Sequence, residues 1–137
     1  MRQRSILTLG VTAVVAAIVV PSCLPLRDAV KDGPGIDGVY VVNGTDTVGN
    51  EYSGNVDVRT SDDGTVQVQW MITGGIQEGT GSLDGDVLEV DWHTVTDPRG
   101  TSSGSAEFVV ADDGTVAGTR TIDGVDGTAS EEWFLRP

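Results

Sequence analysis

The alternation of apolar and polar residues around an Asp-Gly pair most restricts what this chain can fold into. Val56 and Val58 alternate with polar residues, Asp63 and Gly64 interrupt the pattern, and the alternation resumes from Val66. A two-residue period on both sides of an Asp-Gly pair predicts a β-hairpin. Gly64 can adopt the positive φ that such a turn needs, and Asp63 tolerates it better than most residues.

The same arrangement recurs about fifty positions later, where Gly104–Gly118 repeats the alternation and the Asp-Asp-Gly turn. The chain therefore reads as a series of hairpins. Eight segments carry strand patterns, and turns that contain Gly or Asp separate them: Gly38–Asn43, Glu51–Thr60, Thr65–Thr73, Ile76–Leu83, Val87–Val95, Ala106–Ala111, Thr115–Ile122 and Thr128–Leu135.

Short connections between these segments favour an up-and-down meander over a Greek key. Closing eight strands removes exposed edges and creates one core, so the sequence predicts an all-β fold, a small antiparallel β-barrel. A two-sheet sandwich or an open sheet is the alternative. The longest connection, Thr96–Ser105, is expected at one mouth with Arg99 near its tip. The alternation predicts this core: Val56, Val58, Val66, Val68, Trp70, Ile72, Leu88, Val90, Trp92, Phe108 and Val110.

The N-terminal segment has the pattern of an export signal. Arg2 and Arg4 precede an apolar stretch, Ile6–Val20, which is shorter than the ~20 residues of a membrane-spanning helix. The stretch ends at Val20-Pro21-Ser22-Cys23, which resembles the lipobox of bacterial lipoproteins, although Pro21 departs from the usual small or aliphatic residue. We expect a signal peptide over 1–22, lipid attachment at Cys23 with a flexible tether over 23–35, and the barrel over 36–137. Plain secretion and an uncleaved anchor are the alternatives.

The net charge bears on the class of partner. The formal charge is −13, and the leader holds two of the eight basic residues and none of the 21 acidic ones, so the remainder carries −15. Such a chain repels phosphate backbones, which disfavours nucleic acid as a partner. Cys23 is the only cysteine, so no internal disulfide can form.

Aromatic and glycine positions give the chain a family resemblance. It resembles small exported bacterial β-proteins, some of them labelled fibronectin-binding-like. The resemblance implies a β-fold and adhesion to a host matrix protein, without assigning residues to that site. Arg120 stands where these proteins usually place Trp. The matching positions are Tyr40–Gly44, Tyr52–Gly54, Trp70, Gly79–Gly81 and Asp113–Gly118.

Two polar groups are candidate sites of chemistry. Glu89, Asp91 and His93 share one strand face, and a carboxylate beside the only histidine could support general-base catalysis. Their neighbours Leu88, Val90 and Trp92 should face the core, so a solvated outer face is the preferred interpretation. The Asp-rich turns suggest calcium, but their spacing fits neither the helix-loop-helix calcium site nor the glycine-rich calcium repeat. Asp-Gly turns also need these residues for their own geometry.

Trp70, Trp92 and Trp133 come from three different predicted strands. They either line a cavity for a small apolar ligand or fill the core as its largest side chains. We therefore expect a non-catalytic, lipid-anchored envelope or cell-surface protein with a binding or structural role, with no metal or cofactor. A small-ligand carrier and a host-matrix-binding module are the alternatives. The expected partners are the membrane, through the lipid, and an extracellular protein or a small apolar ligand.

Overall fold

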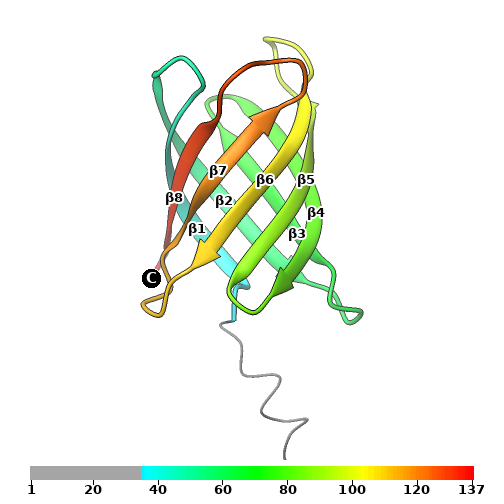
Figure 1. Ribbon diagram of the computed structural model, residues 1–137, viewed down its shortest axis with the longest axis vertical. Coiled ribbons are helices and arrows are strands. Elements are labelled where there is room, and N and C mark those ends of the chain that lie inside the picture. The colour runs from blue at the N-terminus through cyan, green and yellow to red at the C-terminus, as the bar shows by residue number, and fades with distance from the viewer. Residues whose placement is uncertain (1–34) are drawn as a thin grey trace, which may run out of the picture. The chain divides into compact units, whose positions relative to one another are not determined.

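The computed structural model describes residues 35–137, which form a closed antiparallel β-barrel (Figure 1). Each strand pairs with the next one in the chain, and β1 pairs with β8 to close the sheet. The predicted barrel is confirmed over the sandwich and the open sheet. The predicted signal peptide, Cys23 and tether lie outside the described residues, apart from residue 35. The strands are β1 (Gly38–Thr45), β2 (Glu51–Thr60), β3 (Val66–Ile72), β4 (Gly75–Asp84), β5 (Val87–Thr96), β6 (Ser103–Val110), β7 (Val116–Ile122) and β8 (Ala129–Leu135).

In two of the Asp-Gly turns, the aspartate carboxylate accepts a hydrogen bond from a backbone N–H of the same turn. The backbone N–H of Thr65 donates to Asp63 Oδ1 at 2.9 Å, and the N–H of Thr115 donates to Asp113 Oδ1 at the same distance. These bonds hold the pKa of both carboxyl groups below their ordinary value. Gly64 has φ 88°, as predicted, whereas Asp63 keeps a negative φ, so a single left-handed residue is enough for this turn.

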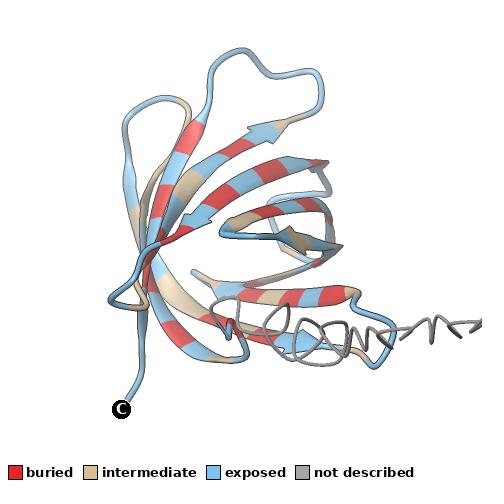
Figure 2. Cartoon of the chain, turned by 60° about the horizontal axis from the view of Figure 1, so that its bottom comes forward, coloured by how far each residue is buried: buried red, intermediate tan, exposed pale blue. Residues whose placement is uncertain are grey.

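Inward and outward residues alternate along every strand (Figure 2). Ten of the eleven predicted core residues are buried, and Ile72 is only partly buried because it lies at the end of β3. Trp133 lies at the centre of an aromatic cluster, with its ring centroid 4.3 Å from that of Phe108 and 6.0 Å from that of Trp70. The interior around this cluster is packed with side chains, as expected for a barrel of eight strands.

The two ends of the barrel differ. One end carries the connections 46–50, 73–74, 97–102 and 123–128, and we call it the mouth (Figure 1). The other end carries three tight turns together with the start of β1 and the end of β8. Ile36 is buried there, and its carbonyl accepts a hydrogen bond of 2.7 Å from Tyr40 Oη. That end is therefore closed by apolar side chains, and the mouth is the open end.

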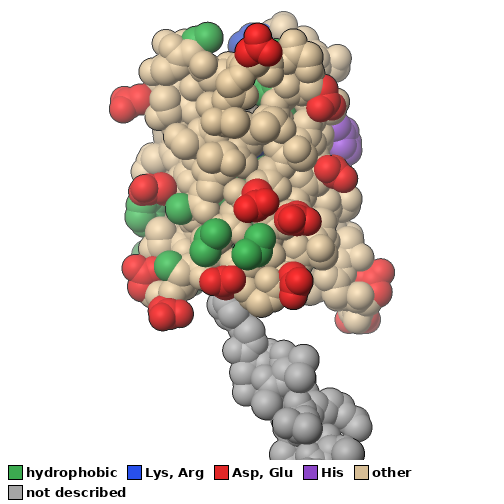
Figure 3. Space-filling model, in the orientation of Figure 1, with side chains coloured by type: hydrophobic (Ala, Val, Ile, Leu, Met, Phe, Trp, Pro, Cys, Tyr) green, Lys and Arg blue, Asp and Glu red, His purple; other side chains and the backbone are tan. Residues whose placement is uncertain are grey.

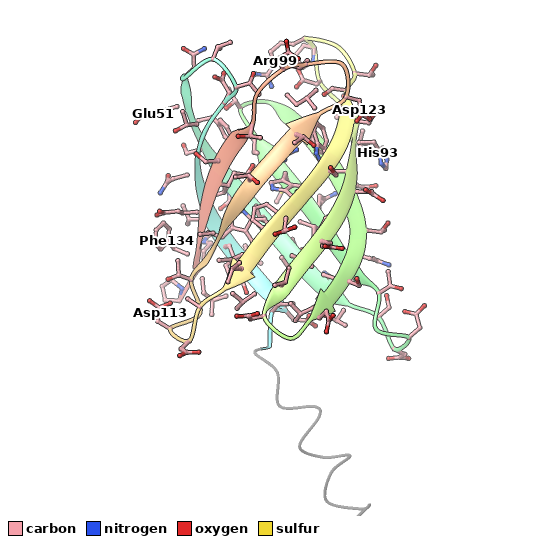
Figure 4. All side chains as sticks on the ribbon, viewed as in Figure 1. Glu51, His93, Arg99, Asp113, Asp123 and Phe134 are labelled. Carbon is pink, nitrogen blue, oxygen red and sulfur yellow. The ribbon has the colours of Figure 1, made fainter. Side chains whose placement is uncertain are left out.

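The loop expected over Thr96–Ser105 is at the mouth but is shorter than predicted, because β6 begins at Ser103. The N–H of Thr94 donates to the carbonyl of Ser102 at 2.8 Å, which continues the β5–β6 ladder beyond the predicted boundary. Arg99 lies in this loop (Figure 4). The described part of the chain contains no helix long and apolar enough to span a membrane.

Candidate functional site

Two charged side chains are buried inside the barrel, Arg120 from β7 and Glu131 from β8. Both follow the inward phase of their strands, which Val116 sets on β7 and Trp133 on β8. Arg120 Nη1 donates to Glu131 Oε1 at 2.8 Å. A buried charge is costly unless it is paired and hydrogen-bonded, and this pair meets the first condition.

Glu131 also meets the second condition, because its two oxygens accept four hydrogen bonds. Besides the bond from Arg120, Oε1 accepts from Tyr52 Oη at 2.6 Å. Oε2 accepts from Trp70 Nε1 at 3.0 Å and from Trp133 Nε1 at 2.8 Å. The donors come from β2, β3, β7 and β8, so this carboxylate joins four of the eight strands. Burial, followed by the nearby charge of Glu131, raises the pKa of the Tyr52 hydroxyl well above its ordinary value.

A glycine makes room for this arrangement. Gly44 on β1 lies opposite Tyr52 on β2, and a Cβ atom at position 44 would overlap the tyrosine ring. The absence of that atom lets the ring lie against the β1 backbone and direct its hydroxyl to Glu131. Gly44 therefore positions Tyr52 by its size.

The guanidinium group of Arg120 lies between two indole rings. Its Cζ is 4.4 Å from the Trp70 ring centroid and 4.2 Å from that of Trp92, both within the range of a cation–π contact. Arg120 Nη2 donates to Gln77 Oε1 on β4, whereas the buried Nε–H has no hydrogen-bond partner. The group is thus held on both faces and retains unused donors at its edge.

A cavity of about 430 Å³ opens at the mouth directly above these residues. Gln77, Arg120 and Tyr52 supply the polar groups of its inner part, and Trp92 reaches it from β5. The volume is within the usual range for small-molecule sites. The remaining lining residues are apolar on the walls and mostly polar at the rim: Ile72, Ile122, Ala129, Thr73, Asp46, Asn50, Glu51, Asp97, Arg99 and Ser102.

The charged residues at the rim of this cavity are mainly acidic. Asp46 accepts hydrogen bonds from the backbone N–H groups of Asn50 and Val48, which lower the pKa of its carboxyl group. Asp97 accepts from Arg99 Nη2 at 2.6 Å and from its Nε at 2.8 Å, and these bonds lower the pKa of Asp97 to about 2. Both carboxylates are therefore charged at neutral pH. Acidic side chains are also scattered over the outer wall (Figure 3).

The three tryptophans proposed as ligand-lining residues all point into the barrel. Only Trp92 lines the mouth cavity, whereas Trp70 and Trp133 lie beneath it in the packed core. Each indole N–H is hydrogen-bonded, and that of Trp92 donates to the Thr121 carbonyl at 3.2 Å. The direct candidate for ligand contact is therefore Trp92.

The polar trio of β5 lies on the outer wall. Glu89, Asp91 and His93 are exposed, and His93 projects away from the barrel (Figure 4). His93 is opposite Glu78 on β4, across an exposed strand pair. No cluster of three or more His, Cys, Asp or Glu side chains is arranged for a metal ion within residues 35–137.

Arg120, Glu131, Tyr52 and Gln77 were not predicted as site residues. A signal was present, because Arg120 shares the inward phase of Val116, and Glu131 shares that of Trp133. A charged residue in phase with an apolar stripe indicates a buried polar site, and it would have located the first two.

Comparison with known proteins bears on the fold. No family model and no curated protein sequence matches this chain. Among solved structures, the chain is similar to a redesigned β-barrel, with 16% identity over 74% of this chain and 92% of that one and a TM-score of 0.61. It is also similar to the redesigned β-barrel mFAP1 bound to DFHBI, with 15% identity over 74% and 94% and a TM-score of 0.59. A fluorescence-activating barrel designed de novo has 11% identity over 73% and 93% and a TM-score of 0.57. At these identities the likeness concerns the fold alone.

Proposed function

We propose that this protein is a non-catalytic barrel that binds a small organic molecule at its mouth. The observation that carries the proposal is the 430 Å³ cavity above the Arg120 guanidinium, with partly apolar walls and polar groups in its inner part. Concave sites with apolar walls and a few fixed polar groups are typical of small-molecule binding. The guanidinium is fixed by two rings and two side chains, so little ordering entropy opposes binding.

We further propose that the barrel works in the cell envelope, attached through a lipid on Cys23. The support comes from the sequence, in which the single cysteine directly follows an export-type apolar stretch. In this arrangement the protein would capture its ligand outside the cytoplasm. Metabolic labelling with a palmitate analogue tests the anchor, because Cys23→Ala should abolish the label. Absence of label in both proteins would make it a secreted carrier.

Ligand binding at the mouth can be tested with a fluorescent probe. The similar barrel mFAP1 was solved bound to DFHBI, and that dye is a suitable first probe here. We expect an increase in dye fluorescence and a rise in the melting temperature. Ile122→Phe, which places a larger side chain against the cavity, should weaken binding at least about tenfold, a loss of ~1.4 kcal/mol.

The matched control is Thr119→Phe, which adds a ring to the outer face of the same strand. It should leave the dye affinity unchanged. Equal loss of binding in both variants would place the dye elsewhere. If neither DFHBI nor a broader set of small molecules binds the full chain, the proposed function is wrong.

A further inference from the structure

The charge distribution around the cavity indicates the chemistry of the ligand. The rim carries three carboxylates, Asp46, Glu51 and Asp97, and one guanidinium, Arg99. The Arg99 charge is already paired with Asp97. Glu51 is exposed, and its carboxylate makes no hydrogen bond or ion pair with any described residue. An incoming cation is therefore attracted to the opening, and an anion is repelled.

The inner part of the cavity offers hydrogen-bond donors, so it requires an acceptor atom on the ligand and not a cation. Arg120 has five N–H donors, and its contacts to Glu131 and Gln77 use one on each Nη. The Nε–H of Arg120 is buried without a partner, although the side chain lines the cavity. Gln77 uses its oxygen to accept from Arg120, which leaves its amide N–H groups to donate.

Glu131 determines which acceptor suits these donors. Its carboxylate neutralises the Arg120 charge at 2.8 Å, so the inner part of the cavity carries no net charge. A carbonyl oxygen can accept the remaining hydrogen bonds without a full negative charge. A purely apolar ligand would leave the donors unpaired, which opposes its binding.

We propose that the ligand is a small amine that also carries a carbonyl or carboxyl oxygen. The oxygen accepts hydrogen bonds from Arg120 and Gln77. The ammonium group lies among the rim carboxylates, and Glu51 is its main partner. This inference rests on the proposed small-molecule site and adds the charge and polarity of its occupant. It predicts a preference for cations over anions of equal size.

Four compounds with one skeleton separate the two requirements. Phenylalaninamide carries an ammonium and a carbonyl group, phenylalanine is the zwitterion, 3-phenylpropanamide lacks the amine, and 3-phenylpropionate is the anion. Isothermal titration of the full chain should rank phenylalaninamide first and 3-phenylpropionate last, with at least about a tenfold difference in affinity. Raising the salt concentration should reduce this difference, because the unpaired charge of Glu51 is exposed.

Substitutions at the two ends of the site should have different effects. Glu51→Gln should weaken phenylalaninamide roughly two- to fivefold and leave 3-phenylpropanamide unchanged, because only the first carries a charge. Gln77→Met should weaken both, because both present a carbonyl group to the inner donors. Glu89→Gln removes the same charge from the outer wall and is the control for net charge, with no change expected.

Equal affinity for the cation and the anion, or tighter binding of the anion, would overturn the inference. The inference would also be overturned if none of the four compounds bound at about 10 mM, a concentration well above the usual dissociation constants of small ligands. If DFHBI still bound in an Ile122-dependent way, the site itself would stand and only the assigned chemistry would be wrong. Loss of all binding would remove both proposals.

Discussion

Arg120 and Glu131 form an ion pair at 2.8 Å inside the barrel, with side chains that are 6% and 0% exposed. The pair lies between the packed aromatic core and the mouth cavity, because Glu131 contacts Trp133 below and Arg120 lines the cavity above. It therefore connects the stability of the fold to the geometry of the site.

Glu131→Gln should destabilise the barrel by about 3–5 kcal/mol, because it leaves the Arg120 charge buried without a counter-charge. The urea midpoint of unfolding, followed by tryptophan fluorescence, measures the loss. Glu132→Gln removes the same charge from the neighbouring exposed position and should change the stability by no more than about 0.5 kcal/mol. A loss below about 1 kcal/mol in Glu131→Gln would show that the pair contributes little to folding.

Arg120→Met should partly rescue Glu131→Gln. The double variant has no buried cation, and the glutamine oxygen can still accept from an indole N–H. We expect a coupling energy of about 1–3 kcal/mol in the double-mutant cycle, because the two side chains share a direct contact. Strict additivity of the two single losses would argue that each side chain acts alone.

The two tyrosines of the chain should resist ionisation in the folded state. Burial raises the pKa of both Tyr40 and Tyr52, with a further rise from the charges of Asp37 and Glu131 respectively. A pKa raised above the unfolded value of about 10 contributes stability that is complete below pH 10 and lost as the pH rises above it. Absorbance at 295 nm should therefore show less tyrosinate near pH 10 in the native protein than in the unfolded one.

The same titration of the protein unfolded in about 6 M guanidinium chloride serves as the control. Both hydroxyl groups should then ionise near pH 10. Tyr40→Phe then isolates the signal of Tyr52. An ordinary titration of the native protein, without unfolding, would contradict the burial of these hydroxyl groups beside carboxylates.

Gly44→Ala should destabilise the barrel by about 1–3 kcal/mol, because the added methyl group overlaps the Tyr52 ring. Gly44 does not have a positive φ, so the effect is steric and not one of backbone strain. In a Tyr52→Ala background the methyl group has room, and the same substitution should then cost much less. A loss of equal size in both backgrounds would remove Tyr52 as the reason for this glycine.

Thr73→Asn should stabilise the protein by about 1 kcal/mol. Thr73 has φ 44° and Gly74 has φ 81°, so both central residues of this two-residue turn are left-handed. A β-branched residue is strained there, and Asn-Gly is the preferred pair. The urea midpoint should rise with an unchanged slope. Thr80→Asn, at an exposed strand position, should instead lower it slightly.

The sequence predicts the strands well because their ends coincide with Gly and Asp turns, and Glu51–Thr60 agrees with β2 at both ends. A closed barrel has one inner face, so simple alternation also identifies residues such as Val56 and Phe108 as core. The inward phase of Glu131 can be read from the sequence, but its partners cannot. A buried carboxylate is tolerated only when it has partners, and Tyr52 is 79 positions away in the sequence. No local pattern reveals such a contact.

The start of β1 and the end of β8 share the end of the barrel remote from the mouth (Figure 1). A linker, resin or sensor chip joined at either of these points leaves the opening facing the bulk solution. The barrel can therefore be tethered in a single orientation for ligand screening, without redesign of its loops.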